Sequence, residues 1–185
     1  MRIKNIIILL AILLVLGGLY YYLNRPEPPP PKEPTYYVWL FEMEELEHIK
    51  IDLPSENLSQ SFIKISRGDE FPWFFDDPEH SDIDTDRWGG GIPLILSGPQ
   101  VSRIITENAT DEQLALYGLI EPSIVITLTL EDGNILYIKV GDKTPDYNNF
   151  YVQAPNRRSV ATVDVSWYTV VERLVKDPPY APPPE

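Results

Sequence analysis

TDEQLALYGLIEPSIVITLTLEDGNILYIKVGD, residues 110–142, is the stretch whose local signals decide the predicted fold. Its first residue, Thr110, and Gln113 three positions later have the spacing of a capping box, in which each side chain accepts a hydrogen bond from the other residue's backbone N–H. Gly118 suits the left-handed position just after a helix, and Pro122 cannot continue a helix. The segment therefore predicts a short helix that stops at Gly118.

Two strands are expected after this helix. In residues 124–130 and 136–140, apolar side chains occupy every second position. This is the period of a strand that buries one face. Asp132 and Gly133, between the two runs, indicate a hairpin. Because so short a helix is marginal on its own, we expect it to pack against this hairpin.

The register of the hairpin depends on the length of its loop. A two-residue turn would place apolar residues of one strand opposite polar residues of the other, because a slip of one residue moves every side chain to the other face. An odd-numbered loop keeps the apolar faces together and is expected to set Leu130 opposite Leu136. Gly133 or Asn134 would then take the positive φ angle.

The order and spacing of several elements resemble a bacterial protein family. The matching elements are Tyr117-Gly118-Leu119, Pro122, the alternating strand, Asp132-Gly133, the strand that ends at Gly141, Pro145 and Tyr151. Together they resemble a family known as a domain of unknown function, DUF4340, over about residues 36–182 and most densely over 114–174. The resemblance implies a membrane-tethered, extracytoplasmic domain, often encoded beside exporter-type ABC transporter components. It implies no catalytic residue.

Other alternating or apolar segments complete the expected domain. Ser166 is expected to cap a second short helix, in which Trp167, Val170, Val171, Leu174 and Val175 form an amphipathic stripe. A helical turn is expected at residues 92–96, and strands are expected at 36–41, 48–53, 61–67, 101–106, 150–153 and 160–164. Strands without regular strand–helix–strand crossovers predict an α+β fold, with a mainly antiparallel sheet and two short packing helices.

The N-terminal segment is typical of a transmembrane anchor. Ile6–Leu23 is an uncharged run of 18 residues, and as a helix it would reach about 27 Å, close to the thickness of a bilayer's hydrocarbon core. Arg2 and Lys4 precede it, so the positive-inside rule places residues 1–5 in the cytoplasm and the remainder outside. The alternative is a signal peptide cleaved after Gly17.

Proline-rich sequence flanks the predicted domain. Residues 24–35 are expected to form a stiff linker that holds the domain on the order of 30 Å from the membrane. An SH3-type ligand is the alternative interpretation, but it would lie on the extracytoplasmic side. The extracytoplasmic domain is expected over residues 36–177, and residues 178–185 are expected to be a loose proline-rich tail.

An acidic run supplies the candidate metal ligands. Asp82, Asp84 and Asp86 have the spacing of the first three ligands of a calcium loop. That loop needs glycine at its sixth position and glutamate at its twelfth, where this chain has Arg87 and Pro93. The three aspartates are therefore candidates only for a weak surface cation site, with a solvated loop as the expected state. No cofactor is expected.

The sequence contains no convincing catalytic constellation. Cysteine is absent, and the two histidines, His48 and His80, lie far apart in the chain. Ser61 and Lys64 have a Ser-x-x-Lys spacing found in some serine hydrolases, but residues three apart on a strand face opposite sides. The net charge of −13 disfavours binding to nucleic acid. We therefore expect a protein that is not an enzyme.

Two functions of different class follow from these observations. The first is a membrane-anchored, non-catalytic interaction or accessory module of a cell-envelope assembly, with an ABC transporter as the partner that the family resemblance implies. The second is a ligand-binding or hydrolytic module that uses the aromatic and acidic region from Trp73 to Trp88 as its cleft. A deep pocket with convergent carboxylates in that region would favour the second.

Overall fold

The computed structural model describes residues 3–23, 35–67, 72–88 and 91–182. The chain divides into two compact units, Met1–Pro34 and Thr35–Glu185. The first unit contains the helix α1 (Ile3–Leu23). Over the described residues, no helix has both the length and the apolar character needed to cross a membrane. The linker expected at 24–35 lies, except for its last residue, outside the described residues.

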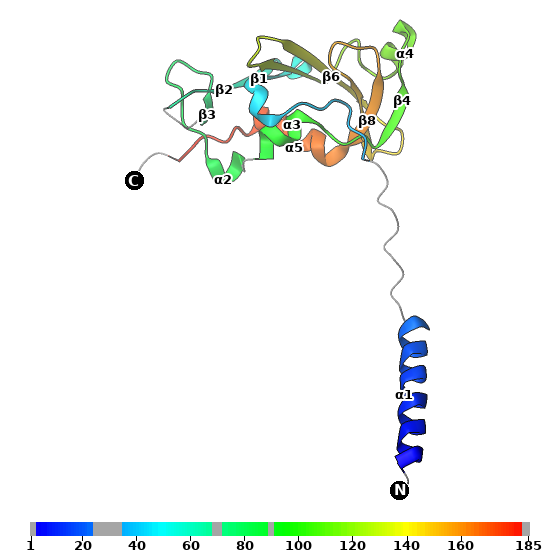
Figure 1. Cartoon of the computed structure of the whole chain (residues 1–185). Helices are drawn as coiled ribbons and strands as arrows, with labels where there is room; N and C mark the ends of the chain where they lie inside the picture. Colours follow the sequence, from blue (N-terminus) through cyan, green and yellow to red (C-terminus); the bar gives the residue numbers. More distant parts are fainter. Residues whose placement is uncertain (1–2, 24–34, 68–71, 89–90, 183–185) are drawn as a thin grey trace. The chain divides into compact units, whose positions relative to one another are not determined.

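The second unit is built on an eight-stranded sheet with the order β3-β2-β1-β5-β6-β7-β8-β4 (Figure 1). Every pairing between named strands of the described residues is antiparallel, as expected. The strands are β1 (Leu46–Leu53), β2 (Leu58–Lys64), β3 (Trp73–Phe75), β4 (Arg103–Thr106), β5 (Ile124–Leu130), β6 (Ile135–Lys143), β7 (Asn149–Gln153) and β8 (Val160–Asp164).

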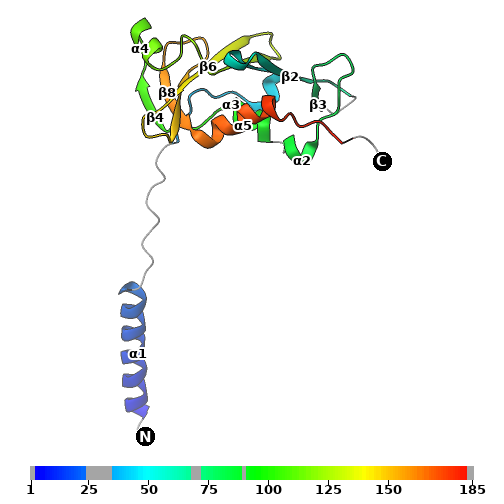
Figure 2. The same cartoon turned by 180° about the vertical axis from the view of Figure 1, so that it is seen from behind.

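Short helices surround this sheet, which confirms the α+β class. They are α2 (Thr85–Trp88), α3 (Gly91–Ser97), α4 (Asp111–Leu116) and α5 (Val165–Lys176), with 3₁₀ turns η1 (Met43–Glu45) and η2 (Pro54–Glu56). Helices α3 and α5 lie along one face of the sheet, and α4 lies on the other side, near β4 (Figures 1 and 2). Two short packing helices and a helical turn at residues 92–96 were expected. Helix α3 confirms the turn, and α2 was not expected.

The main core fills the space between the inner face of the sheet and α5. It takes alternate residues from the strands, such as Ile49 and Ile51 of β1, which are fully buried. Helix α5 contributes the expected stripe: Val171, Leu174 and Val175 are buried, and Trp167 and Val170 pack partly buried against the core. Burying an aliphatic side chain stabilises a fold by about 1.5–3 kcal/mol. This layer of apolar contacts is therefore the main source of stability.

The capped helix and its stop confirm the sequence prediction. The Thr110 hydroxyl accepts from the Gln113 backbone N–H at 3.2 Å, and the Gln113 side chain accepts from the Thr110 N–H at 2.9 Å. Gly118 has a φ of 70°, and the Leu119 N–H donates to the Leu114 carbonyl at 2.8 Å. This is a Schellman motif. The helix therefore stops at Gly118, before Pro122 could end it.

Gly118 and Gly141 form a close backbone junction between the helix stop and β6. The Asp142 N–H donates to the Tyr117 carbonyl at 2.9 Å. A Cβ at Gly141 would overlap the Tyr117 carbonyl oxygen, and one at Gly118 would lie 2.8 Å from the Asp142 nitrogen. Neither residue has room for a side chain, so both glycines are required by this packing.

The hairpin register differs from the expected one by two residues. The loop has an odd number of residues, as expected, and Gly133 has a positive φ of 81°. Leu136 pairs with Leu128, however, and not with Leu130. The Leu130 N–H instead donates to the Asn134 carbonyl at 2.9 Å, closing a three-residue loop. A tight turn with glycine in the left-handed region makes this shorter loop favourable. A shift of two residues leaves every side chain on the same face of the sheet.

Two local predictions were wrong. Residues 36–41 form no strand: Tyr37 makes a single β-bridge with Gln100. The Val38 N–H donates to the carbonyl of Pro99, which has no N–H to return. The cap of α5 is Asp164 and not Ser166, because the Asp164 carboxylate accepts from the Ser166 backbone N–H at 2.8 Å.

The proline-rich tail was expected to be loose, but its first residues are packed. Tyr180 stacks on Phe75 with ring centroids 3.8 Å apart. The Ala181 N–H donates to the Asp82 carbonyl at 3.0 Å. An aromatic side chain within the proline run thus holds the tail through Ala181 on the domain surface.

Candidate binding cleft

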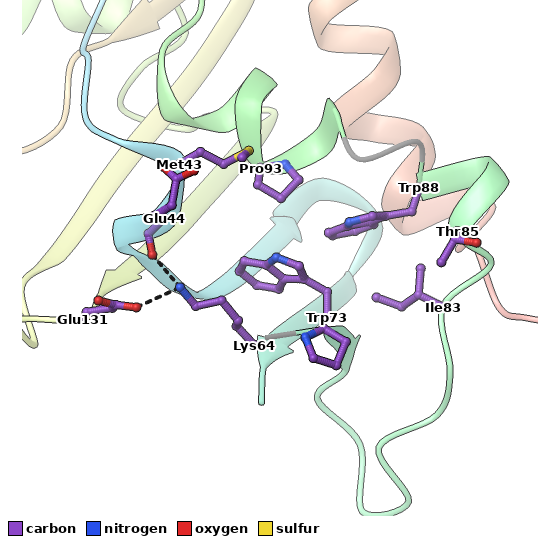
Figure 3. Close-up of a pocket in the computed structure, with 10 residues that line it drawn as sticks. Met43, Glu44, Lys64, Trp73, Ile83, Thr85, Trp88, Pro93 and Glu131 are labelled. Atoms are coloured by element: carbon purple, nitrogen blue, oxygen red, sulfur yellow. Dashed lines mark hydrogen bonds and ion pairs between the residues drawn. The ribbon is translucent and has the colours of Figure 1, made fainter. Parts of the chain in front are cut away.

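A cleft of about 580 Å³ opens at the β3 end of the sheet (Figure 3). Its lining comes from segments that are far apart in sequence, and most of it is apolar. The lining residues are Met43, Glu44, Lys64, Pro72, Trp73, Ile83, Thr85, Trp88, Pro93 and Glu131. Its volume lies within the ~300–1,000 Å³ that is typical of ligand pockets.

Two tryptophans that pack against each other line one side of this cleft. Trp73 begins β3 and pairs with Lys64, the last residue of β2. Trp88 ends α2 and is anchored from behind by Phe62, whose ring centroid lies 4.8 Å away. The Trp73 and Trp88 centroids are 6.0 Å apart (Figure 3). The two rings therefore form one aromatic surface, because aromatic rings at this separation are in contact. Strand pairing holds Trp73 in this surface, and the core holds Trp88.

The indole N–H groups of the cleft differ from the others in the molecule. Trp39 and Trp167 donate to the backbone carbonyls of Leu96 and Ile95, at 2.8 and 3.1 Å. Neither Trp73 nor Trp88 has a hydrogen-bond acceptor for its indole nitrogen among the residues that the structure describes. Neither nitrogen is among the fully buried side-chain atoms of the described residues that lack a partner. Both N–H groups are therefore accessible and can donate to a ligand.

A salt bridge closes one end of the cleft. The Lys64 ammonium donates to Glu131 Oε1 at 2.9 Å and also to the Glu44 carbonyl oxygen (Figure 3). The Lys64 side chain is only 11% exposed, whereas that of Glu131 is 60% exposed. Because both donations are internal, Lys64 serves here to join η1 to the β5–β6 loop rather than to bind an anion.

The three aspartates of residues 82–86 do not line the cleft. Ile83 and Thr85 face the cleft, and the three aspartates alternate with them. Asp84 caps α2 by accepting from the Asp86 N–H at 3.0 Å. In the described part of the chain, no three histidine or acidic side chains gather as metal ligands. The aspartates are thus not brought together as ligands. The alternative hypothesis placed an aromatic and acidic cleft in this region, and the cleft found there is aromatic but has none of the three aspartates in its lining.

One cluster that sequence reasoning did not find joins β1 and β2 to Asp76, the residue after β3. Asp76 Oδ2 lies 3.0 Å from His48 Nε2 and 3.3 Å from Ser61 Oγ. The carboxylate stands between the serine and the histidine, so the histidine does not contact the hydroxyl as a general base would. Only the pairing of β1 with β2 brings His48 near Ser61, and no local motif signals it.

The other candidate catalytic residues, Ser61, Lys64 and His80, do not lie together. Ser61 turns toward Asp76, whereas Lys64 turns toward Glu131, as expected for residues three apart on a strand. His80 lies in a tight turn with a φ of 48°. In this turn the Ser81 N–H donates to Asp77 and lowers the pKa of that carboxyl group. The turn explains His80 without a catalytic role.

Comparison with known families identifies the central part of the chain. The family described as "Domain of unknown function (DUF4340)" matches residues 94–169, which confirms the resemblance found in the sequence. No curated protein and no solved structure matches the chain. Of the residues that line the cleft, Glu131 lies inside the matched segment and the others precede it.

Proposed function

We propose that this chain, whose residues 94–169 belong to the DUF4340 family, is a non-catalytic binding module of a cell-envelope assembly. The observation that carries the proposal is the cleft lined by Trp73 and Trp88. Its walls are apolar, and its two indole donors have no partner among the described residues. Such a site can hold a ligand through contact area and a few directed hydrogen bonds.

The polar groups of the cleft support binding over catalysis. Lys64 is held by Glu131 and the Glu44 carbonyl. Among the described residues that line the cleft, Thr85 is the one with a hydroxyl group, and none is a histidine. A nucleophilic mechanism needs a base within hydrogen-bond reach of the hydroxyl. This favours the ligand-binding form of the second hypothesis over its hydrolytic form.

Membrane anchoring is part of the same proposal. Residues 6–23 carry no charge, and α1 exposes its apolar side chains, including Ile7, Leu13 and Leu16. Arg2 and Lys4 favour a cytoplasmic N-terminus, which would place the binding unit outside the cytoplasm. An ABC transporter component is the partner that the family resemblance suggests. Reporter fusions at Lys32 test the orientation: an extracytoplasmic reporter should be active, and an active cytoplasmic reporter would contradict it.

Site-specific photo-crosslinking tests the binding role. A photoreactive amino acid at Thr85, on the exposed rim of the cleft, should trap a defined membrane-protein adduct in intact cells. The matched control carries the same amino acid at Tyr147, an exposed loop residue that does not line the cleft. Equal adducts from both positions would contradict a binding role for the cleft. Mass spectrometry of the adduct then tests the transporter proposal separately.

A further inference from the structure

We infer that the cleft lined by Trp73 and Trp88 binds an extended, proline-rich segment of a partner protein. This inference rests on the proposed binding role of the cleft and adds the chemistry of its ligand. Extended proline-rich peptides dock in aromatic-lined grooves, because their conformation is already formed before binding and costs little entropy. The aromatic surface that Trp73 and Trp88 form together and the apolar residues around it provide a groove of that kind.

Hydrogen-bond balance favours prolines over ordinary peptide. The cleft presents two indole N–H donors without acceptors among the described residues. A suitable ligand therefore brings acceptors, and it should bring few donors because the apolar lining cannot satisfy them. Proline has a carbonyl acceptor and no N–H. A proline-rich chain in its extended form keeps those carbonyls free, since it makes no internal hydrogen bonds.

The surface beside the cleft already holds a proline-flanked segment of this chain. Residues 178–182 read PPYAP, and Tyr180 from this segment stacks on Phe75. Backbone bonds fix the same segment, since the Asp84 N–H donates to the Pro179 carbonyl at 2.8 Å. Ile83 forms a β-bridge with Tyr180 and also lines the cleft. The proposed site is therefore continuous with a surface that packs a chemically similar segment.

The charges at one end of the cleft favour a basic residue in the ligand. Glu44 and Glu131 stand at one end of the cleft with Lys64 as the cation between them. The whole chain has a net charge of −13. A basic residue beside the prolines would be attracted to this end, and an acidic one repelled. We therefore expect the partner segment to combine consecutive prolines with a nearby arginine or lysine.

Fluorescence anisotropy on the full chain in lipid nanodiscs tests the inference. The probe is a labelled peptide of one arginine followed by eight prolines, and the charge-matched control replaces the prolines with glycine and serine. The proline peptide should bind saturably and the control should not. Trp73→Phe keeps an aromatic wall but removes one donor, and it should weaken binding about 5-fold, as expected for loss of one hydrogen bond.

Two further variants separate binding from folding. Trp167→Phe makes the same chemical change outside the cleft and should leave the affinity unchanged. Thr85→Arg places a bulky cation at the exposed rim and should abolish binding without disturbing the core. Equal binding of the two peptides, or equal losses from Trp73→Phe and Trp167→Phe, would overturn the inference. Binding of lipid or sugar in place of the peptide would also overturn it, whereas a specific Thr85 adduct would still support the binding role.

Discussion

Packing and hydrogen bonding differ between two regions of the domain. One is the junction of Gly118 and Gly141, and the other is the cleft lined by Trp73 and Trp88. At the junction the backbones approach so closely that no Cβ fits, and the Tyr117 carbonyl is satisfied by the Asp142 N–H. At the cleft the side chains leave a space of about 580 Å³, and its two indole donors have no hydrogen-bond partner among the described residues. Satisfied backbone groups and close packing stabilise a fold, whereas open volume and free donors are useful only to a ligand.

The two regions also differ in their relation to the family match. The matched segment, 94–169, contains both glycines of the junction. The walls of the cleft come before that segment. The family match therefore covers the junction and strands β4 to β8. A ligand preference inferred from Trp73 and Trp88 rests on residues outside the matched segment.

The largest expected effect comes from adding a Cβ at the junction. Gly141→Ala should lower the free energy of unfolding by about 3 kcal/mol or more, because the new atom overlaps the Tyr117 carbonyl and the two backbones must separate. Thermal unfolding of the 35–185 unit measures it. Gly91→Ala is the control, since a Cβ there meets nothing within 4 Å. If the two variants melt alike, the junction is not closely packed.

The next effect separates close packing from backbone strain. Gly118→Ala should cost on the order of 2 kcal/mol and Gly118→Val more, because both a positive φ and the contact with Asp142 oppose a side chain. Gly133→Ala keeps the strain, since its φ is also positive, but its Cβ meets open space. It should therefore cost about 1 kcal/mol. Equal melting temperatures for Gly118→Ala and Gly133→Ala would mean that the contact with Asp142 contributes nothing.

Local signals made the junction region predictable from sequence. The Thr110 cap, the stop at Gly118 and the alternation of β5 and β6 each depend on residues a few positions apart. The register was wrong by two residues because the alternation fixes only which face each side chain takes. Gly141 could be noted as a strand end, but its contact with Tyr117 depends on tertiary packing.

The cleft could not be predicted in the same way. Its lining joins η1, β2, β3, α2, α3 and the β5–β6 loop, and no periodic pattern relates these segments. The aromatic residues of 73–88 indicated the region of the cleft. The aspartates there alternate with Ile83 and Thr85, and only Ile83 and Thr85 line the cleft, so its lining is less acidic than the sequence suggested. The tail was misjudged for a similar reason, because the stacking of Tyr180 on Phe75 is a long-range contact.

A third prediction compares tryptophans with and without a hydrogen-bond partner. Trp39→Phe should cost about 2 kcal/mol, because it leaves the Leu96 carbonyl without its donor in the core. Trp73→Phe should cost less than about 1 kcal/mol, since it breaks no hydrogen bond within the described residues. Urea unfolding of the 35–185 unit measures both midpoints. A larger loss for Trp73→Phe would mean that its indole nitrogen has a structural role.

The smallest effect concerns the cap of α5 and its dependence on pH. The Ser166 hydroxyl and the Ser166 backbone N–H both donate to the Asp164 carboxylate. These hydrogen bonds, the hydroxyl's being the larger cause, lower the pKa of Asp164 below the ordinary 3.8. Because the folded-state pKa is the lower one, the carboxylate stabilises the fold fully above its unfolded value and loses this contribution as the pH falls through the folded value.

Asp164→Asn keeps a capping side chain and removes the charge, so at pH 7 it should cost only about 0.5 kcal/mol. The difference in melting temperature between parent and variant should be present at pH 7 and should shrink below pH 3.8, as the parent's Asp164 becomes protonated. Glu47→Gln, at an exposed carboxylate of β1, is the control for nonspecific charge effects. A difference that stays constant as the pH falls would show that the charge of Asp164 does not contribute to the cap.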